Sequence, residues 1–354
     1  TINGGEISAP NCLEIVTLVQ CGRLDGTGTI TGEVFMVSGG SVITSTGANG
    51  ITINGRFRNN SGNIDGTRYT FNHNPDISGD SGWIGAGAIN ARVTYNNNTT
   101  VRALANITMG ANATDGVVFN AGTTLDANDE IVTLVDSNGV ALASVNRLAM
   151  GGTIESSSNL SLTTDRTIVG TGEIACPTFN MTGGSVSPST RTGISDPIGS
   201  ITFDPSIALV MSDTAHSHVS YDCDIASLTN ADHLRVEGAA TLDGTLNVLL
   251  INGFVMPRGS RVDIASITGP LTGWFTTLNL PWGHRLIEFF TDETVLQVFN
   301  CPPDVNSDGF VNGDDYDAFA SAFESGDAFA DFNQDGFVNG DDYDMFASEF
   351  EMGC

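Results

Sequence analysis

The residues best suited to chemistry in this chain form two copies of one twelve-residue loop, at 304–315 and 331–342. Side-chain oxygens fall at loop positions 1, 3, 5, 9 and 12: Asp304, Asn306, Asp308, Asn312 and Asp315 in the first copy, and Asp331, Asn333, Asp335, Asn339 and Asp342 in the second. Position 7, Phe310 or Phe337, offers a backbone carbonyl, and a glycine at position 6 permits the sharp turn. Hard oxygen ligands at this spacing are those that surround calcium with six to eight contacts. The sequence therefore predicts two Ca²⁺ sites.

Each loop is followed by a short helical pattern. Apolar residues recur at i, i+3, i+4 and i+7, which places them on one helix face. They are Tyr316, Phe319, Ala320 and Phe323 after the first loop, and Tyr343, Phe346, Ala347 and Phe350 after the second. Pro302 and Pro303 disfavour a full helix before the first loop. We therefore expect a loop–helix unit that occurs twice.

This duplication, with Asp instead of Glu closing each loop, resembles the dockerin domain over residues 301–354. The resemblance implies that the side chains at positions 1, 3, 5, 9 and 12 of each copy hold one Ca²⁺. Dockerins present a Ser-Thr pair at positions 10 and 11 to a cohesin partner, whereas this chain has Gly313-Asp314 and Gly340-Asp341 there. Two roles for the segment remain open, a docking module and a structural calcium cap.

The charge of residues 301–354 supports a bound cation independently of any family. The segment has 14 acidic residues and no Lys or Arg, and its apolar core is small. Segments of this size usually need a metal or a staple to fold. Bound calcium would supply folding energy and neutralise charge, so we expect the tail to loosen in chelator.

The six cysteines point to an oxidising, extracellular compartment. Their number is even, they accompany calcium loops, and no pair has the CxxC spacing of zinc or redox sites. Cys301 and Cys354 bracket the acidic segment, so a disulfide could tie its ends. The expected pairing is Cys12–Cys21, Cys176–Cys223 and Cys301–Cys354, out of the 15 that six cysteines allow.

The composition of the whole chain excludes several classes of partner. The net charge is −28 and the chain contains no Lys, which argues against nucleic acid and anionic membranes. No apolar run approaches the ~18 residues of a membrane span, so no membrane insertion is expected. The chain starts at Thr1 without Met, as expected for a processed form.

The elements that must position the loops are β-strands. Residues 1–300 are rich in Gly, Asn, Ser and Thr and contain short alternating strands without helical stretches between them, which is typical of a β-solenoid or a sandwich. Residues 26–42 align without gaps to 170–186 with nine of 17 positions identical, which favours a solenoid. Its rungs would contain roughly 20–29 residues. The Asn-rich range 58–100 fits this pattern worst, and we expect it to be an insertion on one edge.

The alternating strands of residues 232–300 resemble the last rungs and cap of autotransporter-passenger-like β-helices, and the likeness extends over about 165–300. They are especially similar to the exported β-repeat proteins of planctomycete-type bacteria, which often carry dockerin-like tails. The resemblance implies a right-handed parallel β-helix and an exported protein. Aromatic residues are expected to plug the end of the solenoid: Trp274, Phe275, Trp282, Phe289 and Phe290. The predicted fold is thus an all-β solenoid over 1–231 with an N-terminal cap near residues 1–25, followed by final rungs and a cap over 232–300 and a small helical calcium domain over 301–354.

Signals for catalysis are few. No GxSxG, HExxH or P-loop occurs. His216 and His218 share one face of a strand and could bind a metal with Asp213 and Asp222, although such a pair is more often a polar surface.

We therefore expect a non-enzymatic extracellular structural protein, a cell-surface or filament subunit. Its tail would mediate assembly into a homo-oligomer or polymer, or bind a docking protein on the cell surface. An adhesin and a carbohydrate-active β-helix enzyme remain the alternatives.

Overall fold

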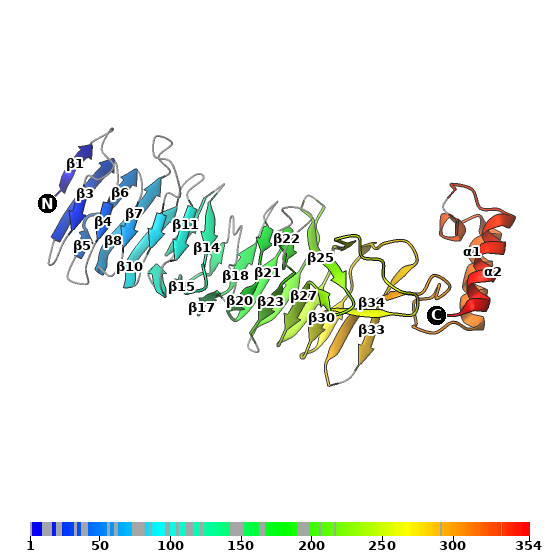
Figure 1. Ribbon diagram of the computed structural model, residues 1–354. Helices are drawn as coiled ribbons and strands as arrows, with labels where there is room; N and C mark the ends of the chain where they lie inside the picture. The colour runs from blue at the N-terminus through cyan, green and yellow to red at the C-terminus, as the bar shows by residue number, and fades with distance from the viewer. Residues whose placement is uncertain are drawn as a thin grey trace.

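Stacked parallel β-strands occupy most of the computed structural model, and two short helices lie at its C-terminal end (Figure 1). The structure describes residues 2–8, 16–18, 23–31, 34–36, 42–54, 57–59, 63–72, 82–84, 87–95, 100–103, 106–110, 116–120, 123–141, 152–162, 167–189, 198–204, 207–215, 217–290, 292–333 and 335–354. Within these ranges the predicted fold class is confirmed: the chain is mostly β, with stacked parallel sheets and a small two-helix region. The handedness of the coil stays a prediction.

One long sheet extends from end to end of the stack. It contains β1 (Ile2–Ser8), β3 (Arg23–Thr31), β5 (Val42–Ser45), β6 (Ile51–Asn54), β8 (Asn63–Asn72), β10 (Gly87–Tyr95), β12 (Ile107–Gly110), β13 (Val117–Phe119), β15 (Ile131–Val135), β17 (Thr153–Ser156), β20 (Gly172–Ala175), β23 (Ser200–Phe203), β27 (His233–Val236), β30 (Arg261–Ile267), β34 (Thr294–Asn300) and β33 (His284–Phe290). Its strand pairs are parallel except at the C-terminal end, where β34 pairs antiparallel with β30 and β33.

Three shorter sheets form the other faces of the stack. The first contains β2 (Val16–Leu18), β4 (Val34–Met36), β7 (Phe57–Asn59), β9 (Gly82–Ile84), β11 (Thr100–Ala103) and β14 (Thr124–Asp126). The second contains β16 (Val140–Ala141), β18 (Leu160–Leu162), β21 (Thr178–Met181), β24 (Ala208–Met211), β28 (Ala239–Leu242) and β31 (Leu271–Gly273). The third contains β19 (Thr167–Val169), β22 (Gly184–Ser187), β25 (Val219–Ser227), β29 (Thr245–Leu250) and β32 (Thr277–Asn279), with β26 (Asn230–Ala231) antiparallel to β25.

The core follows from the two-residue period of a strand, which points alternate side chains inward. Successive rungs place inward residues in register, so that Ile53, Phe71, Tyr95 and Phe119 form one buried row. The ring centroids of Phe71 and Tyr95 lie 5.1 Å apart, and those of Tyr95 and Phe119 lie 5.4 Å apart. Rungs therefore stack like with like, and each buries its apolar face against its neighbours.

The expected insertion at 58–100 is wrong for the described part of that range. β8 pairs with β5, β6 and β10, so it is a regular rung of the long sheet. Tyr69 and Phe71 in β8 and Val93 and Tyr95 in β10 are buried and alternate with more exposed residues. The Asn-rich stretches between these strands concealed this alternation in the sequence.

One expected disulfide is confirmed and another is wrong. Cys301 and Cys354 are bonded, with their Cα atoms 5.5 Å apart. Cys176 and Cys223 are not joined by a disulfide and lie buried in the solenoid core, Cys223 on β25 and Cys176 between β20 and β21. Burial raises the pKa of the Cys176 thiol to about 11. Both cysteines are buried and serve as small apolar core residues. Cys12 and Cys21 lie outside the described residues.

The end of the solenoid is closed differently from the prediction. Phe275 is buried and Trp274 packs against the core, as expected. Trp282, Phe289 and Phe290 are 44%, 45% and 69% exposed, so they do not plug the end. The β33–β34 hairpin closes it instead, with Leu286 and Leu296 turned inward.

The predicted helices follow their loops, as α1 (Gly313–Ser325) and α2 (Gly340–Met352), with the single-turn helix η1 (Ala328–Ala330) between them. Phe319 and Phe346 are fully buried between the helices, and their rings stack with centroids 4.0 Å apart. Among the described residues, no helix is long and apolar enough to span a membrane.

The thiol assignment gives a first prediction. Alkylation of the native protein should leave Cys176 and Cys223 unmodified, because a buried thiol is neither ionised nor accessible; both should react after unfolding without reductant. Peptide mass mapping reads both states, with the linked Cys301–Cys354 peptide as internal control. A linked Cys176–Cys223 peptide would contradict the structure.

Candidate metal centre

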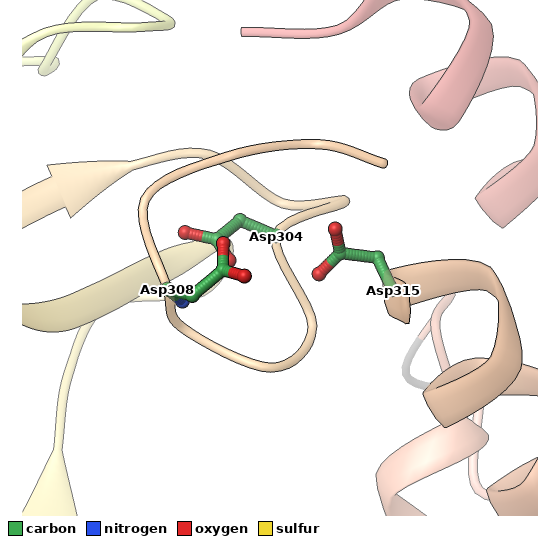
Figure 2. A group of neighbouring side chains, drawn as sticks. All are labelled: Asp304, Asp308 and Asp315. Carbon is green, nitrogen blue, oxygen red and sulfur yellow. The ribbon is translucent and has the colours of Figure 1, made fainter. Parts of the chain in front are cut away.

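Three carboxylates of the first loop gather at the start of α1. Oxygen atoms of Asp304, Asp308 and Asp315 all lie within 4.8 Å of one another. Figure 2 shows Asp304 and Asp308 side by side on the loop, with Asp315 facing them from the beginning of the helix. Asp304 and Asp315 are fully buried, whereas Asp308 is exposed. This all-oxygen cluster could bind a metal ion.

Backbone N–H groups hold two of these side chains in place. The carboxylate of Asp304 accepts hydrogen bonds from the backbone N of Asp308 (3.1 Å) and of Gly309 (3.0 Å). Gly309 has a φ of +85°, a conformation that suits glycine. The loop thus turns around its first carboxylate, as the glycine at position 6 predicted.

Asp315 joins the loop to the helix. Its Oδ1 accepts from the backbone N of Val305 (2.8 Å) and Asn306 (3.1 Å), and its Oδ2 accepts from that of Asn312 (2.9 Å). It also occupies the third position of α1, where it completes a capping box with Asn312. One side chain therefore caps a helix, closes the loop and faces the other two carboxylates.

The electrostatics of the cluster favour a cation. Burial, together with the neighbouring Asp315 and Asp308, raises the pKa of Asp304. The cause is the cost of holding like charges close together in a poorly solvated place. A divalent cation would remove that cost, and carboxylate oxygens are the ligands that calcium prefers.

The second loop repeats the same hydrogen bonds. Asp331 accepts from the backbone N of Asp335 (3.0 Å) and Gly336 (2.9 Å), and Asp342 accepts from that of Asn333 (3.0 Å) and Asn339 (2.8 Å). Burial works to raise the pKa of Asp342, but these and other backbone N–H bonds outweigh it and hold that pKa below its usual range. Of the described residues, only those of the first loop bring three carboxylates within 4.8 Å.

The other predicted ligands contact their own loops. Asn306 accepts from the backbone N of Asp308 (3.0 Å), as Asn333 does from Asp335 (2.8 Å). Asn312 and Asn339 are the N-caps of α1 and α2. Phe310 and Phe337 are 71% and 72% exposed. Because a phenyl ring has no oxygen atom, these residues could contribute only their backbone carbonyls.

Sequence reasoning missed the arginines that contact this region. Arg285 donates to the backbone O of Asp304 (2.7 Å) and Pro302 (2.8 Å). Arg261 donates to the backbone O of Gly309 (3.3 Å), and Arg258 forms an ion pair with Glu349. A signal was present: three of the 13 arginines lie between 258 and 285, directly before a segment that has no basic residue.

The histidine pair is not shown to form a metal site. His218 Nδ1 lies 3.2 Å from Asp213 Oδ2, and the His218 side chain is 78% exposed. Asp222 accepts a hydrogen bond from Asn247 Nδ2 (2.7 Å), and His216 lies outside the described residues. What the structure shows here is a contact at hydrogen-bond distance between His218 and Asp213.

In comparisons with known proteins, no family model, no curated protein and no solved structure matches the chain.

The role of Asp315 gives a second prediction. Asp315→Ala should lower the stability of the calcium-free tail by about 2 kcal/mol, because three backbone N–H groups, one buried and two partly buried, lose their acceptor. Helix loss on heating, followed by circular dichroism at 222 nm, measures it. Asp317→Ala removes an exposed charge from the same helix and is the matched control. Equal effects of the two variants would contradict the assigned role.

Proposed function

We propose that residues 301–354 bind two Ca²⁺, and that this calcium-folded tail serves docking or assembly of a non-enzymatic extracellular structural protein. The first Ca²⁺ would be held by Asp304, Asn306, Asp308, Asn312, Asp315 and the carbonyl of Phe310. The second would be held by Asp331, Asn333, Asp335, Asn339, Asp342 and the carbonyl of Phe337. The observation that carries the proposal is the partly buried triad of Asp304, Asp308 and Asp315.

The donor chemistry supports calcium over other metals. Each loop offers oxygen atoms and no His or Cys, which argues against zinc. Magnesium demands near-octahedral geometry and usually keeps several waters, whereas calcium accepts six to eight ligands with flexible geometry. A twelve-residue loop with five side-chain ligands fits calcium better.

A structural role is supported by the way the tail is fixed. The Cys301–Cys354 disulfide closes the segment next to the last solenoid strand, and Arg258, Arg261 and Arg285 contact it from the solenoid. A disulfide of this kind indicates an oxidising compartment. A rod of repeating rungs with a fixed acidic end suits a surface or filament subunit.

Exposed aromatic residues at this end support a partner. Phe290, Phe310 and Phe337 are each about 70% exposed. Phe310 and Phe337 occupy the same position in the two copies, so calcium-induced order would place both at fixed points. A second copy of the chain, or a docking protein on the cell surface, would cover them.

Calcium removal tests the proposal. Calorimetric titration of the metal-free chain should give two bound Ca²⁺ per chain, because each loop supplies a full oxygen set. Light scattering should show an oligomer in calcium that dissociates in EDTA, and magnesium at the same concentration is the control. A chain that binds no calcium contradicts the metal sites, and one that stays monomeric with calcium bound contradicts assembly.

One observation favours carbohydrate binding or cleavage as a second candidate. On the outer face of the long sheet, Glu173 hydrogen-bonds to Asp204 beside a surface hollow of about 530 Å³ lined by Thr133, Glu155 and Asp204. Burial, followed by Asp204 and Glu237, raises the pKa of Glu173, as in a carboxylic acid that donates a proton in glycoside hydrolysis.

Assays against acidic and neutral polysaccharides separate this candidate from the first. An enzyme should release reducing or unsaturated ends and lose that activity in Glu173→Gln. Glycan binding without turnover would identify an adhesin. If neither binding nor cleavage is observed, the structural role remains the supported function.

A further inference from the structure

The two loops are the same at every ligand position, yet they lie in different surroundings. They differ in sequence only at position 2, Val305 or Phe332, and at position 4, Ser307 or Gln334. Asp304 is fully buried, whereas Asp331 is half-buried. The first loop gathers three carboxylates within 4.8 Å, and the second does not. Because the ligands are identical, the ligand set itself is not the cause, and the contacts around each loop differ.

The solenoid holds the first loop at two points. At the loop entry, Arg285 of β33 donates from Nε to the backbone O of Asp304 (2.7 Å) and from Nη2 to that of Pro302 (2.8 Å). Its Nη1 donates to the backbone O of His284 (3.1 Å), which fixes the guanidinium on its own strand. At the turn, Arg261 of β30 donates to the backbone O of Gly309 (3.3 Å).

Apolar contacts and the disulfide reinforce these two points. Val311 of the first loop packs against the cluster of Ile287, Phe299 and Cys301. The Arg261 guanidinium lies 4.6 Å from the centre of the Phe299 ring, which keeps that arginine in place. These contacts hold the first loop on the solenoid end.

The second loop has a different kind of contact. Its Phe332 ring packs edge-on against Trp282, with centroids 6.1 Å apart. Arg258 donates to the backbone O of Glu349 (2.7 Å) and Gly353 (2.6 Å), which lie at the end of α2 and beyond the loop. Within the described ranges, no arginine donates to the backbone of residues 331–342.

We propose that the two calcium sites are unequal, that the first is the tighter site and fastens the tail to the solenoid, and that Arg285 is its positioning residue. The inference rests on the proposed calcium binding. A loop whose entry and turn are already fixed loses less conformational freedom when it closes on the ion.

The positive charge of Arg285 opposes calcium binding, whereas its hydrogen bonds to the loop favour it. The geometry of these hydrogen bonds decides which effect is larger. The Arg285 guanidinium repels a cation, but three carboxylates surround the site and exceed its single charge. Its donors are directed at backbone carbonyls, so removing it would leave two carbonyl oxygens and the loop entry without support. We therefore expect loss of Arg285 to weaken the first site.

Single-loop variants of the full chain test the inequality. Asp335→Ala disables the second loop and leaves the first, whereas Asp308→Ala at the matched position does the reverse. Calorimetric titration with CaCl₂ should give a dissociation constant at least tenfold lower for Asp335→Ala. Equal constants, or the reverse order, would overturn the inference.

A solenoid substitution then tests the positioning role. Arg285→Gln should weaken the first site about tenfold when added to Asp335→Ala, and change the second site less than twofold when added to Asp308→Ala. Arg235→Gln, at an arginine paired with Glu237 away from the tail, is the control. An unchanged or strengthened first site, or equal weakening of both, would count against Arg285.

A second variant and the wild-type titration separate failure of this inference from misfolding and from failure of the proposed function. If Arg285→Gln does not fold, judged by circular dichroism, Arg261→Gln at the exposed second point should weaken only the first site, by about threefold. No change there would overturn the role of the solenoid contacts. A wild-type chain that binds no calcium would instead contradict the proposed function itself.

Discussion

The placement of Asp304 and Asp315 is the constraint on which the C-terminal region depends. Two buried carboxylates with a third close by form an arrangement that like charges oppose. Backbone N–H groups of the loop donate hydrogen bonds to the carboxylate oxygens and offset part of the repulsion between the carboxylates. A cation bound by the triad would offset the rest. The core of this acidic segment is small and centres on Phe319 and Phe346.

The solenoid gives this small region its support. Its rungs stack in parallel register and bury rows of Ile, Phe and Tyr, so its end is a rigid platform. The last strands carry Arg261 and Arg285, which supply the positive charge that the tail lacks. The disulfide then keeps residue 354 beside residue 301. The carboxylate cluster of the first loop and the stacked strands are thereby joined in one structure.

Local patterns predicted the elements well, because they depend on backbone geometry. Oxygen ligands at fixed loop positions, a glycine at position 6 and a stripe at i, i+3, i+4 and i+7 identified α1, α2 and the turns before them. Alternation and a repeat indicated stacked rungs. Prediction failed where Asn-rich stretches between the strands concealed the alternation of buried and exposed residues, as in β8 and β10. It also failed where one residue type had two uses, as with the buried thiols of Cys176 and Cys223.

The sequence alone determined the ligand spacing, the helix faces, the two-residue period of the strands and the charge of the tail. These are properties of neighbouring residues, and the periods of helix and strand make them readable. Only the tertiary structure decided which loop gathers its carboxylates and which arginines contact it. Arg258 and Glu349 are 91 residues apart in the chain, and Arg285 and Asp304 are 19 apart. Such pairs meet because of how the rungs stack and where the last strands turn back. Two loops with identical ligand positions acquire different surroundings for that reason.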